Sequence, residues 1–334
     1  MLVVWGDVVT VSLSQNSVCG FLLPMIDIRG RCLRLGSVLD DVLGRHDYPP
    51  SVAHLVAESV ILTALIGSAT KLQGRLSLQV RGDGPVSLIA TDYMAKEENE
   101  EPKLRAYGRV GPDKLPEPPW YLKALMGAGV MGVMIDQGQG APYQALTPMV
   151  GPSLAHTAEA FFAQSEQLAT RFQIRVTQDK QGSWQGGGIM LQMLPKSPLK
   201  DIEIEPADHG LLTPEDIARM ADQDDSWNRA GILLDTVHQA ELCDPELAHE
   251  VLISRLFHEE FPQIYEPTPL AFGCSCSAEK LRAVLETYSQ SERNELITPE
   301  GVIEALCEFC GANYRFDPVS LGDEPRKNQK KRKD

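Results

Sequence analysis

The chain has 334 residues, of which 43% are hydrophobic and 23% are charged, and its formal net charge is −15. These values are ordinary for a globular protein and exclude a fibrous, collagen-like or wholly disordered chain. The acidic balance argues against a nucleic-acid partner, because affinity for phosphates comes from Lys and Arg.

Neither a secretory signal nor a membrane span is predicted. The first seventeen residues lack a basic segment and are interrupted by polar side chains. The longest strongly apolar run, residues 60–69, is far shorter than the roughly 20 residues that a membrane helix needs. We therefore expect a cytoplasmic protein with no membrane partner. In a reducing compartment, clustered cysteines favour metal binding or redox chemistry over a structural disulfide framework.

Residues 18–199 carry the pattern of an α+β domain. Residues 1–17 are a weakly patterned extension, and a first strand is predicted over residues 26–35. A long buried helix is predicted over residues 48–72, with a Pro-Pro pair at its entry, where the missing N–H groups cost little.

The clearest hairpin follows this helix, with a turn at Asp83-Gly84. Its alternating apolar positions are Leu76, Leu78, Val80, Val86 and Leu88. Residues 96–102 form an acidic exposed loop, and a second strand pair flanks the Gly-rich residues 136–142. A helix is expected from about 153 to 170, and a third strand pair over 172–195. Strands joined by hairpins with interspersed helices indicate α+β rather than parallel α/β architecture.

Residues 200–265 change in character, since residues 200–260 hold sixteen acidic and four basic side chains, a net −12. Helices are predicted with N-caps at Thr213 and Asp244, each followed by proline. One helical face carries Trp227, Ala230, Leu234 and Val237. Like charges repel along these helices, so we interpret the segment as a metastable acidic helical linker. A plain acidic surface domain fits the composition equally well.

Four of the seven cysteines form two pairs near the C-terminus. Cys274 and Cys276 make a CxC pair, and Cys307 and Cys310 make a CxxC pair after thirty intervening residues. Four thiolates around Zn²⁺ give a closed tetrahedral site without an open catalytic position. A domain as small as residues 266–320 usually needs a metal to fold. Inside it we predict a helix with Leu281, Val284, Leu285 and Tyr288 on one face, and a tight turn at Gly311.

Several readings of the four cysteines remain open from spacing alone. A structural zinc ribbon and an iron–sulfur cluster would use the same ligands. A thioredoxin-like site is disfavoured, because the CxxC pair does not head a βαβ unit. The CxC pair favours a redox switch, since residues two apart on an extended backbone point to the same side and a thiolate is the form that oxidants attack.

The remaining candidate residues carry weaker signals. Cys19, Cys32 and Cys243 are isolated in sequence and are interpreted as small buried hydrophobes. His249 and His258 are expected on helix surfaces rather than as ligands. We find no GxGxxG, P-loop or GxSxG motif, which is consistent with a protein that is not an enzyme. Residues 321–334 are a basic stretch that we expect to be a disordered tail.

Over most of its length the chain resembles the redox-regulated heat-shock protein 33 chaperones, also called 33 kDa chaperonins. The resemblance ends on the CxC and CxxC pairs, and the segments that carry it are "IRGR" at 28–31, "RHDYPPSVAHLVAE" at 45–58, "SLQVRGDGPVSLIATDY" at 77–93, "SEQLATRF" at 165–172, "GGIMLQMLP" at 187–195 and "LFHEE" at 256–260. The first seventeen residues, the insert at 96–102 and the basic tail fall outside it.

The resemblance implies a holdase rather than an enzyme. In the reduced state Cys274, Cys276, Cys307 and Cys310 would bind one Zn²⁺ and keep the chaperone inactive. Oxidation would form the disulfides Cys274–Cys276 and Cys307–Cys310, release zinc and unfold the linker, so that unfolding client proteins are bound; a homodimer is expected when oxidised. The alternative is a constitutive zinc-ribbon binding or adaptor protein. If its partner were a nucleic acid, the adjoining segment with a net charge of −12 would repel the phosphates.

A further expectation concerns what holds the linker together. Like charges crowd its helices, so tertiary contacts must stabilise them, and the folded zinc domain is the nearest predicted support. Loss of the metal should then melt residues 200–265 while residues 18–199 stay folded. The side chains expected to become exposed are Trp227, Leu233, Leu234, Val251, Leu252 and Phe257.

Overall fold

The computed structural model describes residues 15–95, 100–111, 115–118, 120–194 and 214–321, without the side chains of 214–224. Most of the predicted acidic loop, the cap at Thr213 and the predicted tail beyond Leu321 lie outside these ranges. The chain divides into two compact units, Met1–Phe272 and Gly273–Asp334. Both contain helices and antiparallel strands, and this confirms the predicted α+β class.

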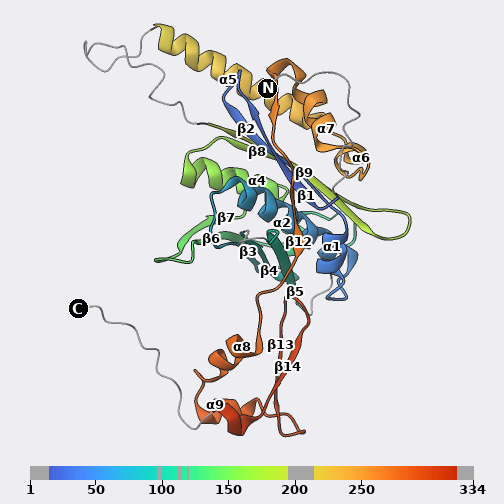
Figure 1. Ribbon diagram of the computed structural model, residues 1–334, viewed down its shortest axis with the longest axis vertical. Helices are drawn as coiled ribbons and strands as arrows, with labels where there is room; N and C mark the ends of the chain where they lie inside the picture. The colour runs from blue at the N-terminus through green and yellow to red at the C-terminus, as the bar shows by residue number, and fades with distance from the viewer. Residues whose placement is uncertain (1–14, 96–99, 112–114, 119, 195–213, 322–334) are drawn as a thin grey trace, which may run out of the picture. The chain divides into compact units, whose positions relative to one another are not determined.

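Two sheets form the framework of the first unit (Figure 1). The first sheet has the order β10-β1-β2-β9-β8, with β11 also paired to β1. Its strands are β1 (Ser17–Leu23), β2 (Ile28–Leu35), β8 (Thr170–Gln178), β9 (Trp184–Met193), β10 (Gln263–Ile264) and β11 (Thr268–Pro269). The second sheet has the order β12-β5-β4-β3-β6-β7. Its strands are β3 (Arg75–Gly82), β4 (Val86–Met94), β5 (Lys103–Val110), β6 (Gly129–Asp136), β7 (Tyr143–Pro148) and β12 (Ala271–Phe272).

Helix α2 (Pro50–Ala69) lies between the two sheets and forms the centre of the main core (Figure 1). It is apolar on all sides, as expected for a helix covered on both faces. By length and composition it could cross a membrane, yet 78% of its most apolar window is buried inside the protein, so it is a core helix. Three shorter helices complete this layer: α1 (Ser37–Leu43), α3 (Leu122–Met126) and α4 (Leu154–Phe161).

The acidic segment forms a helical layer on the opposite face of the first sheet (Figure 1). This layer consists of α5 (Pro214–Asp235), α6 (Gln239–Leu242), α7 (His249–Phe257) and a 3₁₀ turn at His258–Glu260. A second core joins the helices to the strands, with buried side chains from α5, α6 and α7 against residues of β1, β2 and β9. The first sheet is therefore apolar on both faces.

Three features of the first unit differ from the sequence analysis. The strand Ser17–Leu23 was not predicted; it pairs along its whole length with β2, from Ser17 opposite Arg34 to Leu23 opposite Ile28. The helix expected over 153–170 is α-helical only as far as Phe161. A π-helical turn follows over Phe162–Glu166, and Gln167 ends it in the left-handed region (φ 54°).

The third concerns an expected helix cap. Asp244 does not cap α7, which begins five residues later; its carboxylate accepts a hydrogen bond from the Glu246 amide at 2.9 Å in a local turn. The predicted hairpin of β3 and β4 is confirmed, with an unbroken register from Arg75 opposite Met94 to Arg81 opposite Leu88. On its other side, β4 shifts register against β5 between Val86 and Leu88, and Ile89 rather than Leu88 is buried.

The second unit has a small core. Its elements are α8 (Ala278–Leu285), α9 (Gln290–Glu295), β13 (Ile303–Leu306), β14 (Asn313–Phe316) and a 3₁₀ turn at Pro318–Leu321. The buried apolar side chains in it are Leu285, Ile303, Phe316 and Leu321. Of the predicted helix face, Val284 and Tyr288 are instead exposed, at 53% and 41%. So few buried side chains cannot stabilise a domain of this size, which needs a further crosslink or a metal.

Candidate metal centre

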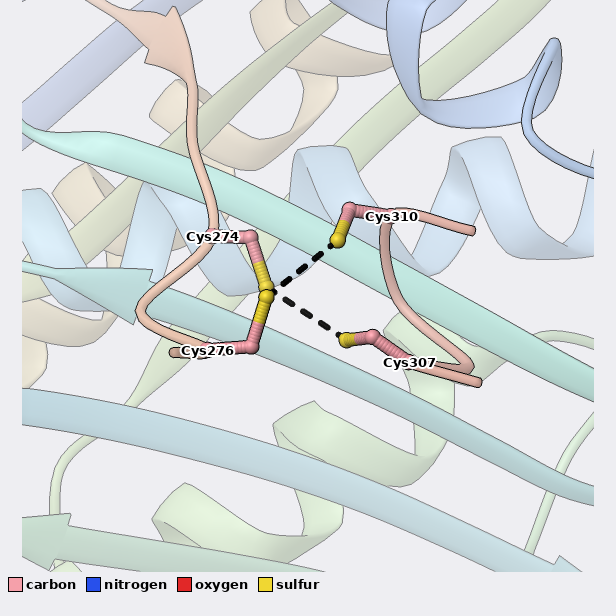
Figure 2. A group of neighbouring side chains, drawn as sticks. All are labelled: Cys274, Cys276, Cys307 and Cys310. Carbon is pink, nitrogen blue, oxygen red and sulfur yellow. Dashed lines mark hydrogen bonds between the residues drawn. The ribbon is translucent and has the colours of Figure 1, made fainter. Parts of the chain in front are cut away.

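The four predicted cysteines come together in the second unit (Figure 2). Their sulfur atoms all lie within 4.8 Å of one another, and each side chain is half-buried. The Cys274 and Cys307 sulfurs are 3.7 Å apart, and those of Cys276 and Cys310 are 3.4 Å apart. Two segments separated by thirty residues thus contribute two sulfurs each to one cluster.

The CxxC pair is positioned by the turn of a hairpin. β13 ends just before Cys307, whose amide donates to the Ala312 carbonyl at 2.9 Å. The Gly311 amide donates back to the Cys307 carbonyl at 2.8 Å, and Gly311 itself has φ 71°. A side chain would strain this left-handed conformation, so glycine is required directly after Cys310. This confirms the turn predicted there.

The CxC pair is positioned by the start of a helix. Ser277 is the N-cap of α8, and its hydroxyl accepts a hydrogen bond from the Lys280 amide at 3.2 Å. Cys276 directly precedes this cap, and Cys274 follows the end of β12 by two residues. The pair therefore lies on non-helical backbone between two fixed points.

The donor set and its spacing fit a tetrahedral zinc ion. With Zn–S bonds of about 2.3 Å, the sulfurs of a Cys₄ site lie about 3.8 Å apart. The observed separations of 3.7 and 3.4 Å are close to this value. Four thiolates are soft ligands and suit zinc. Since they fill all four positions, the site has no place for a catalytic water.

A cation would also resolve the electrostatics of the cluster. Burial raises the pKa of Cys310 to about 12, and burial likewise raises the pKa of Cys307, whose sulfur also accepts backbone hydrogen bonds from Cys310 and Phe309 that lower it. Four thiols this close resist becoming four anions on their own. A bound dication supplies the charge that holds them as thiolates.

Tyr314 is a site residue that sequence reasoning missed. Its hydroxyl lies 3.2 Å from the Cys276 sulfur, and that contact is the main cause that raises the pKa of Tyr314 to about 12. The phenol thus stays protonated and can donate to a metal-bound sulfur, and such a hydrogen bond holds a ligand in its orientation toward the metal. The available signal was its place in the strand directly after the CxxC turn.

The other candidate residues lie in the first unit. Cys19, Cys32 and Cys243 are buried, as predicted, and His258 is exposed. His249 is not on the surface but only 3% exposed, which corrects the prediction.

The His249 ring bridges two strands beneath α7. Its Nε2 lies 2.9 Å from the Ser17 hydroxyl, and its Nδ1 lies 3.4 Å from the Cys32 sulfur. Burial, followed by the charge of Arg34, lowers the pKa of His249 to about 3. The ring is therefore neutral while α7 covers the sheet.

The linker helices are held by the first sheet, a support that the sequence analysis did not identify. Phe257 of α7 is fully buried and stacks on Phe21 of β1, with ring centroids 5.8 Å apart. The Arg34 guanidinium of β2 donates to the carbonyls of Leu242 at 3.2 Å and Glu241 at 3.3 Å.

Of the side chains expected to become exposed, Trp227, Leu233, Leu234, Leu252 and Phe257 belong to this core. Val251 does not, because it is already 53% exposed. If the linker helices left the first sheet, the newly exposed apolar surface would therefore belong partly to the helices and partly to the sheet.

Comparison with known proteins finds relatives that match most of the chain. The profile of the Hsp33 protein family matches residues 16–317. A 33 kDa chaperonin of Caulobacter vibrioides (strain NA1000 / CB15N) is 35% identical over 313 residues, covering 91% of this chain and 95% of that protein. A 33 kDa chaperonin of Escherichia coli (strain K12 / DH10B) is 31% identical over 303 residues, covering 91% and 92%.

The fold matches a solved structure of a further 33 kDa chaperonin. The crystal structure of a 33 kDa chaperonin (heat shock protein 33 homolog) from Thermotoga maritima matches with a TM-score of 0.74, covering 92% of this chain and 97% of that one at 20% identity. The chain belongs to the Hsp33 family of chaperones.

Proposed function

We propose that this chaperone is a redox-regulated holdase, inactive with zinc bound and active after oxidation. The observation that carries the proposal is the order along the chain, in which the clustered cysteines follow the segment that covers the first sheet. Four half-buried thiols lie within 4.8 Å of one another, and the chain leading into them is the segment that covers an apolar sheet face. Oxidation of the four sulfurs can therefore affect how these helices pack on the sheet.

The chemical step is the oxidation of two thiol pairs. In the reduced protein Cys274, Cys276, Cys307 and Cys310 hold one zinc ion as four thiolates. The proposed disulfides are Cys274–Cys276 and Cys307–Cys310, and each gives two electrons to a peroxide, which is reduced to water. A disulfide sulfur is no longer an anionic ligand, so the metal leaves. Because the buried core of this unit is small, the unit then unfolds.

Residues 263–272 connect this event to the linker helices. They are held to the first unit by three strands of two residues each, β10, β11 and β12. The amides of Tyr265 and Ala271 donate to the carbonyls of Gly20 at 2.9 Å and Pro102 at 3.1 Å. The ring of Phe272 lies under the Arg45 guanidinium at 4.7 Å. Such short pairings are weak on their own, so we propose that they detach when the adjoining unit unfolds.

Detachment of this segment would remove the C-terminal anchor of α7. The helices of the linker carry a net −12 over residues 200–260 and rely on the sheet for support. Their release uncovers the apolar faces of both layers, and large exposed apolar patches bind other apolar chains. The clients are therefore unfolding proteins in the cytoplasm, and we propose a homodimer for the oxidised form. Acidic charge disfavours nucleic acid.

The test is a client-aggregation assay with reduced and peroxide-treated protein, while a chelating dye follows zinc. The proposal requires suppression of aggregation only after zinc has been released. Suppression by the reduced, zinc-loaded form to the same extent would refute redox regulation, and no suppression by either form would favour the constitutive zinc-ribbon adaptor. Sedimentation of both forms measures the dimer.

A further inference from the structure

Two cysteines outside the metal centre face each other in the first sheet. Cys19 of β1 and Cys32 of β2 are directly opposed in the antiparallel register. Opposed residues of such a pair point to the same face, with Cα atoms about 4.5–5.5 Å apart. This separation lies within the range of about 4.4–6.8 Å that a disulfide spans. The backbone can therefore accept a cross-strand disulfide without moving.

Both thiols are covered by the linker. The Cys19 sulfhydryl donates to the carbonyl of Tyr265 at 3.1 Å, and the Cys32 sulfur contacts the His249 ring. Both side chains are 0% exposed and belong to the core between the sheet and the helices. Burial raises the pKa of each thiol to about 12. While the cover is in place, neither thiol can become the thiolate that oxidants attack.

We propose that Cys19 and Cys32 are a second redox pair, which forms a cross-strand disulfide only after residues 249–265 leave the sheet. The inference rests on the proposed function, because the linker must open first. A peroxide oxidises one exposed thiolate to a sulfenic acid, with loss of hydroxide. The second thiol attacks that sulfur and releases water, so that two electrons and two protons leave the pair.

The disulfide would keep the sheet uncovered. It removes the S–H group that donates to the Tyr265 carbonyl and replaces the sulfur contact of His249 with a bonded sulfur of altered position. A returning α7 would leave these buried polar groups without their partners, which is unfavourable. Re-docking of the linker would then require reduction of the Cys19–Cys32 disulfide as well as rebinding of zinc.

Cys243 provides the matched control. It too is buried, and burial raises the pKa of its thiol to about 11. Its sulfur donates to the Arg175 carbonyl at 3.5 Å, and it lies at the end of α6 rather than opposite another cysteine in a strand. Exposure alone would make Cys243 reactive without giving it a cross-strand partner.

The experiment maps disulfides in the full-length protein. Zinc-loaded protein is treated with hydrogen peroxide, blocked with N-ethylmaleimide, digested without reduction and analysed by mass spectrometry, with hydrogen exchange of α7 measured in parallel. We expect a Cys19–Cys32 linked peptide that accumulates only when α7 amides have lost protection, with no disulfide-linked peptide that contains Cys243. Free Cys19 and Cys32 in protein whose α7 exchanges freely would overturn the inference.

A second arm separates this inference from the proposed function. If zinc release leaves α7 protected, the proposed function fails, and the linker is then opened in reduced protein by urea before peroxide is added. A linked peptide in that arm supports the pair, and free thiols overturn it.

A third measurement addresses the consequence of the disulfide. After reductant and zinc are added back, the Cys19→Ser/Cys32→Ser variant keeps polar groups for Tyr265 and His249 but cannot form the disulfide, and it should return to the inactive state severalfold faster than the wild type and the Cys243→Ser variant. Equal rates in all three proteins would exclude the proposed delay.

Discussion

Replacing Phe257 by alanine should activate the chaperone without oxidation. The ring is fully buried between α7 and the first sheet and stacks on Phe21 at 5.8 Å. Truncation of a buried Phe costs about 3–5 kcal/mol. Here that energy is lost from the docking of the linker, because the ring belongs to the core that joins the two layers.

The size of this loss sets the expected effect. Since about 1.4 kcal/mol is a factor of ten, the docking equilibrium shifts toward the open state by a factor of about 10² to 4 × 10³. The metal centre lies in the other unit and is not altered. The variant should therefore keep its zinc and still suppress aggregation of an unfolding client when reduced.

The assay combines client aggregation, zinc content and hydrogen exchange of α7 in reduced protein. Phe261→Ala is the control, because it is the same substitution at a side chain that is 71% exposed. We expect it to behave as the wild type. A reduced Phe257→Ala protein whose α7 exchanges about 10² times faster, yet which remains inactive, would refute the idea that linker docking is the block on activity.

Three further outcomes are expected. Cys274→Ser should abolish stoichiometric zinc binding, because an incomplete tetrahedral site holds the metal poorly; iron in the wild type, or full zinc occupancy in the variant, would contradict the assignment. Tyr314→Phe removes the hydroxyl beside the Cys276 sulfur and should weaken zinc affinity about 10- to 100-fold, measured by chelator competition; unchanged affinity would show that the hydroxyl does not help Cys276 to hold the metal. The pKa of His249 is about 3 when docked against 6.5 normally, so docking is fully stable above pH 6.5 and weakens as the pH falls below it. At pH 5.5 the loss is about 1.4 kcal/mol, and α7 should exchange about tenfold faster after correction for intrinsic rates, a dependence that His249→Gln should remove.

Local sequence signals predicted the parts of the fold that depend on neighbouring residues. The hairpin turn at Asp83-Gly84, the core helix Pro50–Ala69 and each of the two cysteine pairs are encoded by short patterns. Gly311 is of the same kind, because its left-handed backbone is a requirement of the turn itself. These features could be read from spacing because their physical cause lies within a few residues.

The features that were missed depend on partners far away in sequence. Ser17–Leu23 forms a strand because it pairs with β2. His249 is buried because α7 packs on the face of these two strands. Tyr314 joins the site only through folding of the hairpin onto the CxC segment. The linker's support could not be assigned, since the amphipathic pattern shows that one face is buried but not which surface covers it.

The most direct test of the account is hydrogen exchange of α5 and α7 during a peroxide titration, with zinc measured in the same samples. We expect protection over residues 225–257 to be lost in proportion to zinc released, while α2 stays protected in its own core. Chaperone activity should rise along the same curve. Linker amides that remain protected after all zinc has left, or activity that appears while they are protected, would contradict it.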